Sequence, residues 1–200
     1  VDDVGFVLTL ISNLAATYGA DPGKVFAAGI SNGGIFTQRL ACDATSSFRA
    51  FGVVAANFPA DYQGMCHPAH PVPMIFFNGT TDGIMPWDGG SIKSNKLLGM
   101  GAGGAVLSHD QTVAFWTGVD GCGGTGATQA LPDIANDGTT VIRRRSSSWR
   151  RPECRAKRWP RCWVAIRNAT ACLKSAWNWA RRWTSFCAPW RASGRASCTG

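Results

Sequence analysis

The sequence predicts an α/β fold in which helices cover a parallel sheet. Two observations lead to this prediction: short apolar runs that suit buried parallel strands, and segments between them with apolar residues at helical spacing. The expected strands span 24–30, 51–56 and 72–77, and the expected helices span 4–18, 35–42 and 111–119. Strands that alternate with helices are typical of a parallel sheet with covered faces.

The first expected helix has signals at both of its ends. Asp2 and Asp3 stand at its start, where carboxylates favour the positive end of the helix dipole. Gly19 and Pro22 follow at its other end, as is typical where a helix stops. The Gly-rich segment 93–104 is loop-like, and we assign it no place in the fold.

The charge of the chain changes abruptly near residue 142. Residues 1–142 hold 5 Lys or Arg against 11 Asp, a net charge of −6, whereas residues 143–200 hold 15 Lys or Arg against Glu153 alone, a net charge of +14. Seven of the nine Trp and five of the eight Cys also lie in the second part. We therefore expect a folded segment 1–142 and an irregular or poorly ordered basic tail 143–200 that is not part of the fold.

Three interpretations of this tail stay open. Arg interleaved with Trp suits a segment that binds nucleic acid or an anionic surface, and residues 166–183 could form an amphipathic helix on a membrane surface. The composition is also typical of a GC-rich gene translated in a shifted frame, which is the interpretation we favour. The tail cysteines show neither a C-x-x-C pair nor the spacing of metal ligands.

Gly29-Ile-Ser31-Asn32-Gly33 matches the pattern G-x-S-x-G of a nucleophile elbow. An apolar strand leads into the pattern and an apolar helix leaves it, which is the context that an elbow requires. Glycines on either side of Ser31 would avoid collisions between strand and helix, and the N–H of Asn32 would point at a tetrahedral oxyanion. The alternative is a Gly/Ser loop that fits the pattern by chance.

A serine nucleophile needs a histidine base that a carboxylate orients. Asp82 is the candidate acid, because it follows the strand over 72–77 and so lies at the sheet edge where the elbow lies. The alternative is an ordinary turn aspartate before Gly83.

Several motifs together resemble one enzyme group. They are V-D-D-V-G-F at 1–6, D-P-G-K-V-F at 21–26, G-I-S-N-G-G at 29–34, N-G-T-T-D-G-I-M-P-W-D-G-G at 78–90, and T-V-A-F-W followed by G-C-G-G at 112–124. Over residues 1 to about 140 the chain resembles the polyhydroxybutyrate depolymerase and feruloyl/acetylxylan esterase group of α/β-hydrolases. The resemblance implies a partial α/β-hydrolase fold that lacks the N-terminal strands.

The resemblance also bears on the catalytic residues. In this group the motif H-G-T-x-D-x-x-V-P-Y carries the acid of the triad, which falls on Asp82, while Asn78 replaces the usual His and Trp87 the usual Tyr. We expect the sequence to begin inside a domain. The first oxyanion loop of this enzyme group would then lie before Val1. The motif G-G-H-x-W-P that holds the catalytic histidine is not present.

None of the three histidines is assigned as the base. His67 and His70 precede Asp82, whereas the expected chain order is Ser, Asp, His. His109 follows Asp82 but stands at the start of a helix, where we expect a helix-capping or solvated role. The catalytic histidine therefore stays unknown.

The resemblance implies a secreted serine esterase that acts on polyhydroxyalkanoate or on feruloyl or acetyl esters of polysaccharide, inactive or impaired in this chain. Such an esterase needs no metal or organic cofactor, and we expect residues 1–142 to bind neither nucleic acid nor a membrane. Secreted relatives often carry disulfides, so a Cys42–Cys66 bridge is a hypothesis, with free thiols as the alternative and the state of Cys122 open. The alternative function is a non-catalytic basic protein that binds through the Arg/Trp-rich tail. No stretch reaches the roughly 18 apolar residues of a membrane span, and no signal peptide is visible.

Overall fold

The computed structural model of the protein describes residues 1–93, 103–122, 125–134, 136–146 and 162–167. The chain divides into two compact units, Val1–Ala169 and Thr170–Gly200, and all described residues lie in the first. The expected loop over 93–104 falls mostly outside the described residues.

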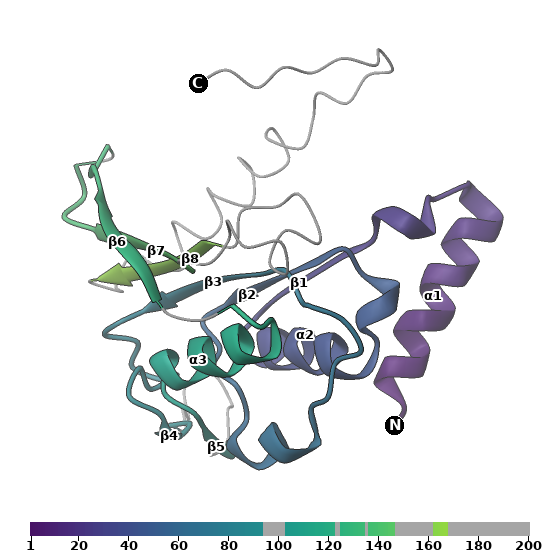
Figure 1. The fold of residues 1–200 in the computed structure, drawn as a ribbon, viewed down its shortest axis with the longest axis horizontal. Helices are drawn as coiled ribbons and strands as arrows, with labels where there is room; N and C mark the ends of the chain where they lie inside the picture. Colours follow the sequence, from purple (N-terminus) through teal and green to yellow (C-terminus); the bar gives the residue numbers. More distant parts are fainter. Residues whose placement is uncertain (94–102, 123–124, 135, 147–161, 168–200) are drawn as a thin grey trace. The chain divides into compact units, whose positions relative to one another are not determined.

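The main sheet has six strands in the order β1-β2-β3-β8-β7-β6 (Figure 1). They are β1 Phe26–Ile30, β2 Ala50–Val54, β3 Met74–Gly79, β6 Thr125–Leu131, β7 Thr140–Ser146 and β8 Cys162–Arg167. Neighbouring strands from β1 to β8 run parallel, and β7 is antiparallel to both β8 and β6. A second, two-stranded sheet pairs β4 Gly90–Ser91 with β5 Ala105–Val106. The three strands expected from apolar runs are thus confirmed as a parallel sheet.

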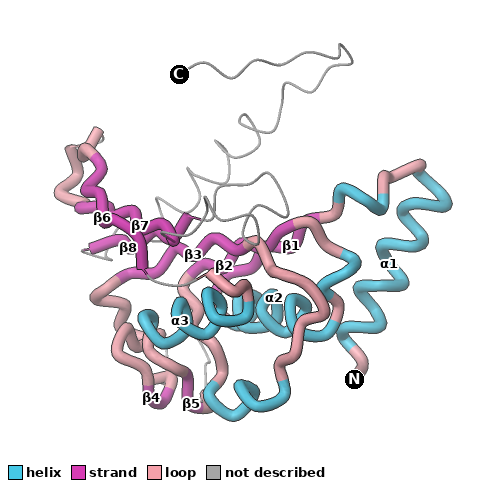
Figure 2. Tube along the Cα trace, viewed as in Figure 1, coloured by secondary structure: helices cyan, strands magenta, loops and turns pink. Residues whose placement is uncertain are grey.

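Within the described residues, three α-helices accompany the sheet (Figure 2). They are α1 Asp3–Tyr18, α2 Asn32–Asp43 and α3 His109–Val119, and three 3₁₀ turns lie at η1 Pro22–Lys24, η2 Thr45–Ser47 and η3 Ala60–Met65. The carboxylate of Asp2 accepts from the N–H of Gly5 at the start of α1, and Gly19 ends it in the left-handed region. These are the end signals that the sequence predicted.

The core of the described residues lies between the sheet and helices α2 and α3, which Figure 1 shows on the same side of β1–β3. Phe58 stacks on Phe115 with 4.5 Å between ring centroids and meets Trp116 edge-on. Strand β1 ends the sheet, so it has a neighbour on one side only, and its Phe26 and Ile30 are 43% and 46% exposed. The expected cover on the sheet is therefore incomplete at β1 among the described residues.

The segment after residue 142 contains the strand β8 and the greater part of β7. Strand β8 pairs in parallel with β3, and the expected boundary between 142 and 143 falls inside β7. The expectation of irregular structure is therefore wrong for 143–146 and 162–167. Apolar Trp163–Ile166 suits a strand that can extend the edge of a parallel sheet. The division of the chain at 142 itself stays a prediction.

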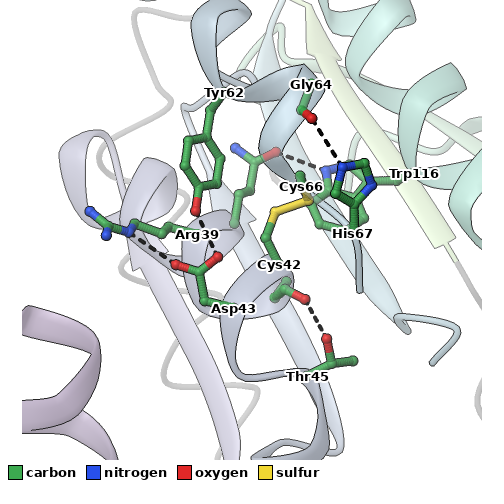
Figure 3. The surroundings of a disulfide bond; sticks show 11 residues. Arg39, Cys42, Asp43, Thr45, Tyr62, Gly64, Cys66, His67 and Trp116 are labelled. Carbon is green, nitrogen blue, oxygen red and sulfur yellow. Dashed lines mark hydrogen bonds and ion pairs between the residues drawn. A yellow bond between two sulfur atoms is a disulfide. The ribbon is translucent and has the colours of Figure 1, made fainter. Parts of the chain in front are cut away.

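A disulfide joins Cys42 near the end of α2 to Cys66 just after η3, which confirms the hypothesised bridge (Figure 3). Both cysteines are buried, and Cys122 is disulfide-bonded as well. Beside the bridge, the Tyr62 hydroxyl donates to Asp43 over 2.6 Å and the Arg39 guanidinium contacts the same carboxylate over 3.2 Å. Within the described part of the chain, no helix combines the length and the hydropathy that crossing a bilayer requires.

Candidate active site

Ser31 occupies the turn between β1 and α2 in a strained backbone conformation. Its φ of 54° and ψ of −122° lie in a region that side chains other than glycine rarely adopt. The N–H of Ser31 donates to the Val54 carbonyl of β2 over 2.9 Å, and its carbonyl accepts from Ile35 of α2 over 3.0 Å. The half-buried serine is thus fixed between a strand and a helix, as a sharp strand-to-helix turn requires.

The glycines around Ser31 differ in what surrounds them. A Cβ at Gly29 would lie 2.2 Å from the carbonyl oxygen of Gly33, and a Cβ at Gly34 would lie 2.7 Å from the Cβ of Ala56. A Cβ at Gly33 would meet nothing within 4 Å. The expectation that both Gly29 and Gly33 prevent collisions holds at Gly29 and is wrong at Gly33. Close packing of α2 on the strands instead requires Gly34.

Asn32 is the first residue of α2 and is exposed. The first N–H groups of a helix have no carbonyl partner within the helix, and they lie at the positive end of its dipole. The position of Asn32 directly after Ser31 therefore suits a donor to an anionic oxygen beside the serine.

Asp82 follows the end of β3 by three residues and is half-buried. Its Oδ1 accepts from the N–H groups of Ile84 over 2.8 Å and Met85 over 2.9 Å. Strands β1, β2 and β3 are parallel neighbours, so Ser31 and Asp82 follow strand ends at the same edge of the sheet. With about 4.8 Å between adjacent strands, the ends of β1 and β3 lie ~10 Å apart.

His67 and His70 are exposed, and neither stands in the expected order after Asp82. The Nε2 of His67 lies 3.0 Å from the Gly64 carbonyl, next to the Cys42–Cys66 bridge. That bridge attaches to the far end of α2, a helix of 12 residues and so ~18 Å long, whereas Ser31 precedes its first residue.

His109 is the first residue of α3 and is 3% exposed. Its ring stacks on Trp87 with 4.1 Å between centroids and meets Phe76 edge-on. Burial lowers the pKa of His109 to about 4, with Asp110 raising it and Arg144 lowering it. The helix cap is Ser108, which forms a capping box with Gln111. The expected capping or solvated role of His109 is therefore wrong: the ring is a buried, neutral packing group.

Comparison with known proteins identifies the group to which these motifs point. No family profile matches the chain. It is 28% identical to feruloyl esterase B of Piromyces equi over 134 residues, which is 62% of the chain and 23% of that protein. It is 27% identical to the putative esterase NocK of Nocardia uniformis subsp. tsuyamanensis over 143 residues, 70% of the chain and 41% of that protein.

A third relative is the poly(3-hydroxyoctanoate) depolymerase of Pseudomonas fluorescens, 31% identical over 83 residues, 39% of the chain and 30% of that protein. The chain is thus similar to several esterases and to one polyester depolymerase. The resemblance expected from the motifs is thereby confirmed. The chain spans between 23% and 41% of the length of these three relatives.

The sequence of the chain did not predict one feature of the structure, a group of buried polar residues. Four buried side chains form a hydrogen-bonded group between α2, α3 and the strand ends: Gln38, Asn57, Asn78 and Trp116. Their positions are far apart along the chain and match no motif.

Among the residues that the structure describes, no group of three or more His, Cys, Asp or Glu side chains could hold a metal ion. The arrangement at the sheet edge instead combines a hydroxyl, a helix N-terminus and a carboxylate, which are the parts used in acyl transfer.

Proposed function

We propose that the chain carries the nucleophile and acid of a serine carboxylic-ester hydrolase of the α/β-hydrolase type. In this proposal Ser31 is the nucleophile, the Asn32 amide donates to the oxyanion and Asp82 orients the base. The observation that carries the proposal is the strained turn at Ser31 between β1 and α2, with φ 54° and ψ −122°. Similarity to feruloyl esterases and a polyester depolymerase supports the same chemistry.

The reaction would proceed by acyl transfer. The Oγ of Ser31 bonds to the ester carbonyl carbon while a base takes its proton, and the carbonyl oxygen becomes the oxyanion that the Asn32 N–H binds. The ester C–O bond then breaks, and the alcohol leaves with the proton from the base. Water hydrolyses the acyl-serine by the same steps. Asp82 suits the orienting role because two backbone N–H groups hold its Oδ1 in place.

This chain lacks a histidine in a position to act as that base. The sequence holds three histidines: His67 lies beside the disulfide, His70 precedes Asp82, and the ring of His109 is buried against Trp87. Loss of the base alone lowers kcat of a serine hydrolase by about 10⁶-fold. We therefore propose that the chain is nearly inactive as it stands.

The proposed substrates are polymer-borne carboxylic esters, either polyhydroxyalkanoate or feruloyl or acetyl esters of polysaccharide. The relatives include feruloyl esterases and a poly(3-hydroxyoctanoate) depolymerase, and their names support the feruloyl esters and the polyester in this range. We also propose an extracellular location. The Cys42–Cys66 disulfide supports that location, because disulfides persist in oxidising compartments.

Hydrolysis of p-nitrophenyl butyrate by the full chain, with and without added imidazole, tests the proposal. We expect slow turnover that imidazole raises by acting as the missing base. Ser31→Ala should lose this turnover down to the rate of imidazole alone, whereas the control Ser46→Ala, at an exposed serine, should keep it.

Equal turnover by Ser31→Ala and the unmodified chain would show that Ser31 is not the nucleophile. Ser31-dependent turnover at about 1 s⁻¹ or faster without imidazole would contradict the proposed impairment instead.

One observation favours a second candidate function, the net charge of +14 over residues 143–200. A basic segment of this kind would bind nucleic acid or anionic membranes through charge neutralisation. Two of its arginines already have partners within the described residues: Arg144 contacts Asp110 of α3 over 2.9 Å, and Arg143 donates to Gln129 of β6. Binding of DNA or anionic vesicles that weakens with salt would support this candidate, and no binding at low salt would exclude it.

A further inference from the structure

The buried hydrogen-bonded group noted above has Asn57 at its centre. Asn57 follows β2 by three residues and is fully buried. Its Nδ2 donates to the Pro86 carbonyl over 2.8 Å, and its Oδ1 accepts from the Nδ2 of Asn78 over 2.8 Å. Its backbone carbonyl accepts from the Nε2 of Gln38 over 3.2 Å. One residue thus joins three separate segments of the chain.

Each of the three segments leads along the chain to a residue of the candidate active site. Gln38 belongs to α2, the helix that begins directly after Ser31. Pro86 directly follows Met85, whose N–H donates to Asp82. Asn78 lies in β3, four residues before Asp82, and its amide also donates to the Ala56 carbonyl over 3.3 Å. A hydrogen-bonded route between α2 and the Asp82 turn therefore passes through Asn57.

Gln38, which lies at the α2 end of this route, also has a hydrogen-bond partner in α3. The indole Nε1 of Trp116 in α3 donates to the Oε1 of Gln38 over 3.0 Å, so both ends of the glutamine amide have partners. Gln38, Asn57 and Trp116 are 0% exposed and Asn78 is 3% exposed. The amides of Gln38 and Asn57 have partners at both ends, whereas the Oδ1 of Asn78 has none. A buried amide with both ends matched holds its partners in one geometry, since a shift would leave a polar atom unpaired.

We propose that Asn57 is a positioning residue that fixes the Asp82 turn relative to the helix led by Ser31. The inference rests on the proposed function for its catalytic meaning. Reaction rates depend steeply on such placement, because a displacement of about 1 Å at a catalytic group can lower turnover by about 10²-fold. Asn57 touches neither the substrate nor the reacting atoms in this proposal; it acts through Pro86 and Gln38.

Amide hydrogen exchange on the full-length chain, measured by NMR, tests the proposal without requiring activity. The variant Asn57→Leu keeps a similar volume and the backbone carbonyl but removes the side-chain bonds to Pro86 and Asn78. We expect the N–H groups of Ile84 and Met85 to lose exchange protection, because the turn is no longer held. Thr45→Val is the matched control, since it removes a buried hydroxyl that donates to Ala41 over 2.7 Å at the far end of α2. It should leave Ile84 and Met85 protected.

A second variant, Gln38→Met, tests the proposal even if Asn57→Leu does not fold. Gln38→Met leaves the Asn57 side chain intact and removes the bonds of the Gln38 amide to the Asn57 carbonyl and to Trp116. It should therefore change the exchange of Ile35, whose N–H donates to Ser31, while Ile84 stays protected. Unchanged protection of Ile84 and Met85 in folded Asn57→Leu would overturn the proposal. So would equal loss in Thr45→Val, and so would Gln38→Met without effect at Ile35.

The kcat and KM of ester hydrolysis distinguish a positioning role of Asn57 from a purely structural one. With imidazole present, Asn57→Leu should lower the Ser31-dependent kcat about 10²-fold and leave KM unchanged, whereas Thr45→Val should change neither. A rise in KM at constant kcat would contradict positioning. If the unmodified chain shows no Ser31-dependent turnover, the proposed function fails, and the exchange measurements still decide the role of Asn57.

Discussion

Gly29 and Gly33 flank the same serine but stand in different surroundings, which predicts opposite outcomes on substitution. Gly29→Ala would place a Cβ 2.2 Å from a backbone oxygen and 2.3 Å from a backbone carbon of Gly33, so the chain must shift. We expect a loss of about 3 kcal/mol or more in the free energy of unfolding. Gly33→Ala adds a Cβ in open space within α2, so it should be neutral or gain up to about 1 kcal/mol. Urea unfolding of both variants measures the difference, and equal losses would refute the asymmetry.

His109 predicts a specific pH dependence of stability. Burial lowers the pKa of His109 to about 4 in the folded chain, against 6.5 for an exposed histidine. Between these two values the unfolded chain binds a proton that the folded chain does not bind. The free energy of unfolding should therefore fall as pH falls from about 6.5 to about 4, by about 3 kcal/mol in full, and this contribution should level off below pH 4.

The variant His109→Phe isolates that contribution. A phenyl ring can keep the stack on Trp87 and the edge contact with Phe76, and it has no titrating group. Between pH 6.5 and 4, the free energy of unfolding of this variant should fall by about 3 kcal/mol less than that of the unmodified chain. His70→Gln, at an exposed histidine, should keep the full pH dependence. An identical pH slope in His109→Phe and the unmodified chain would show that another group is responsible.

At the scale of elements, the disulfide fixes the far end of the helix that Ser31 begins. Cys42 and Cys66 are 24 residues apart in the sequence, so the bridge closes a short loop of the unfolded chain. The double variant Cys42→Ala/Cys66→Ala should lose about 3 kcal/mol of stability. Thermal unfolding under non-reducing conditions measures this loss. An unchanged Tm would mean that α2 and the segment after η3 are held equally well by the Asp43–Tyr62 hydrogen bond and the surrounding core.

The elements that could be predicted from sequence are those with local signals. Asp2 and Gly19 stand within a residue of the ends of α1, and the strand and helix around Ser31 lie next to the motif itself. Asn57 gave no such signal, because its partners lie 19, 21 and 29 residues away. The position of His109 at a helix start was predicted, but its burial depends on Trp87 and Phe76, which only the folded chain brings to it.

At the scale of the whole molecule, the largest difference from expectation concerns the sheet. Composition divides the chain at 142, because charge and Trp content change there. Pairing of β8 with β3 joins residues from both sides of that division, more than 80 positions apart in the sequence. No local pattern encodes a partner at that distance, since parallel pairing is fixed by the assembled sheet. Arg144 also crosses the division through its contact with Asp110 in α3.

Two truncated chains decide whether this division is physical. A chain of residues 1–169 keeps β8 and the whole first compact unit, so its Tm should equal that of the full chain. A chain of residues 1–142 loses β8 and most of β7, which leaves β3 as an open edge with unpaired backbone groups. It should therefore unfold at a lower temperature or aggregate, each kcal/mol lost lowering Tm by about 2–4 °C. If residues 1–142 are instead as stable as the full chain, the sheet needs no strand from the basic segment, and 143–200 is an appendage to a fold complete without it.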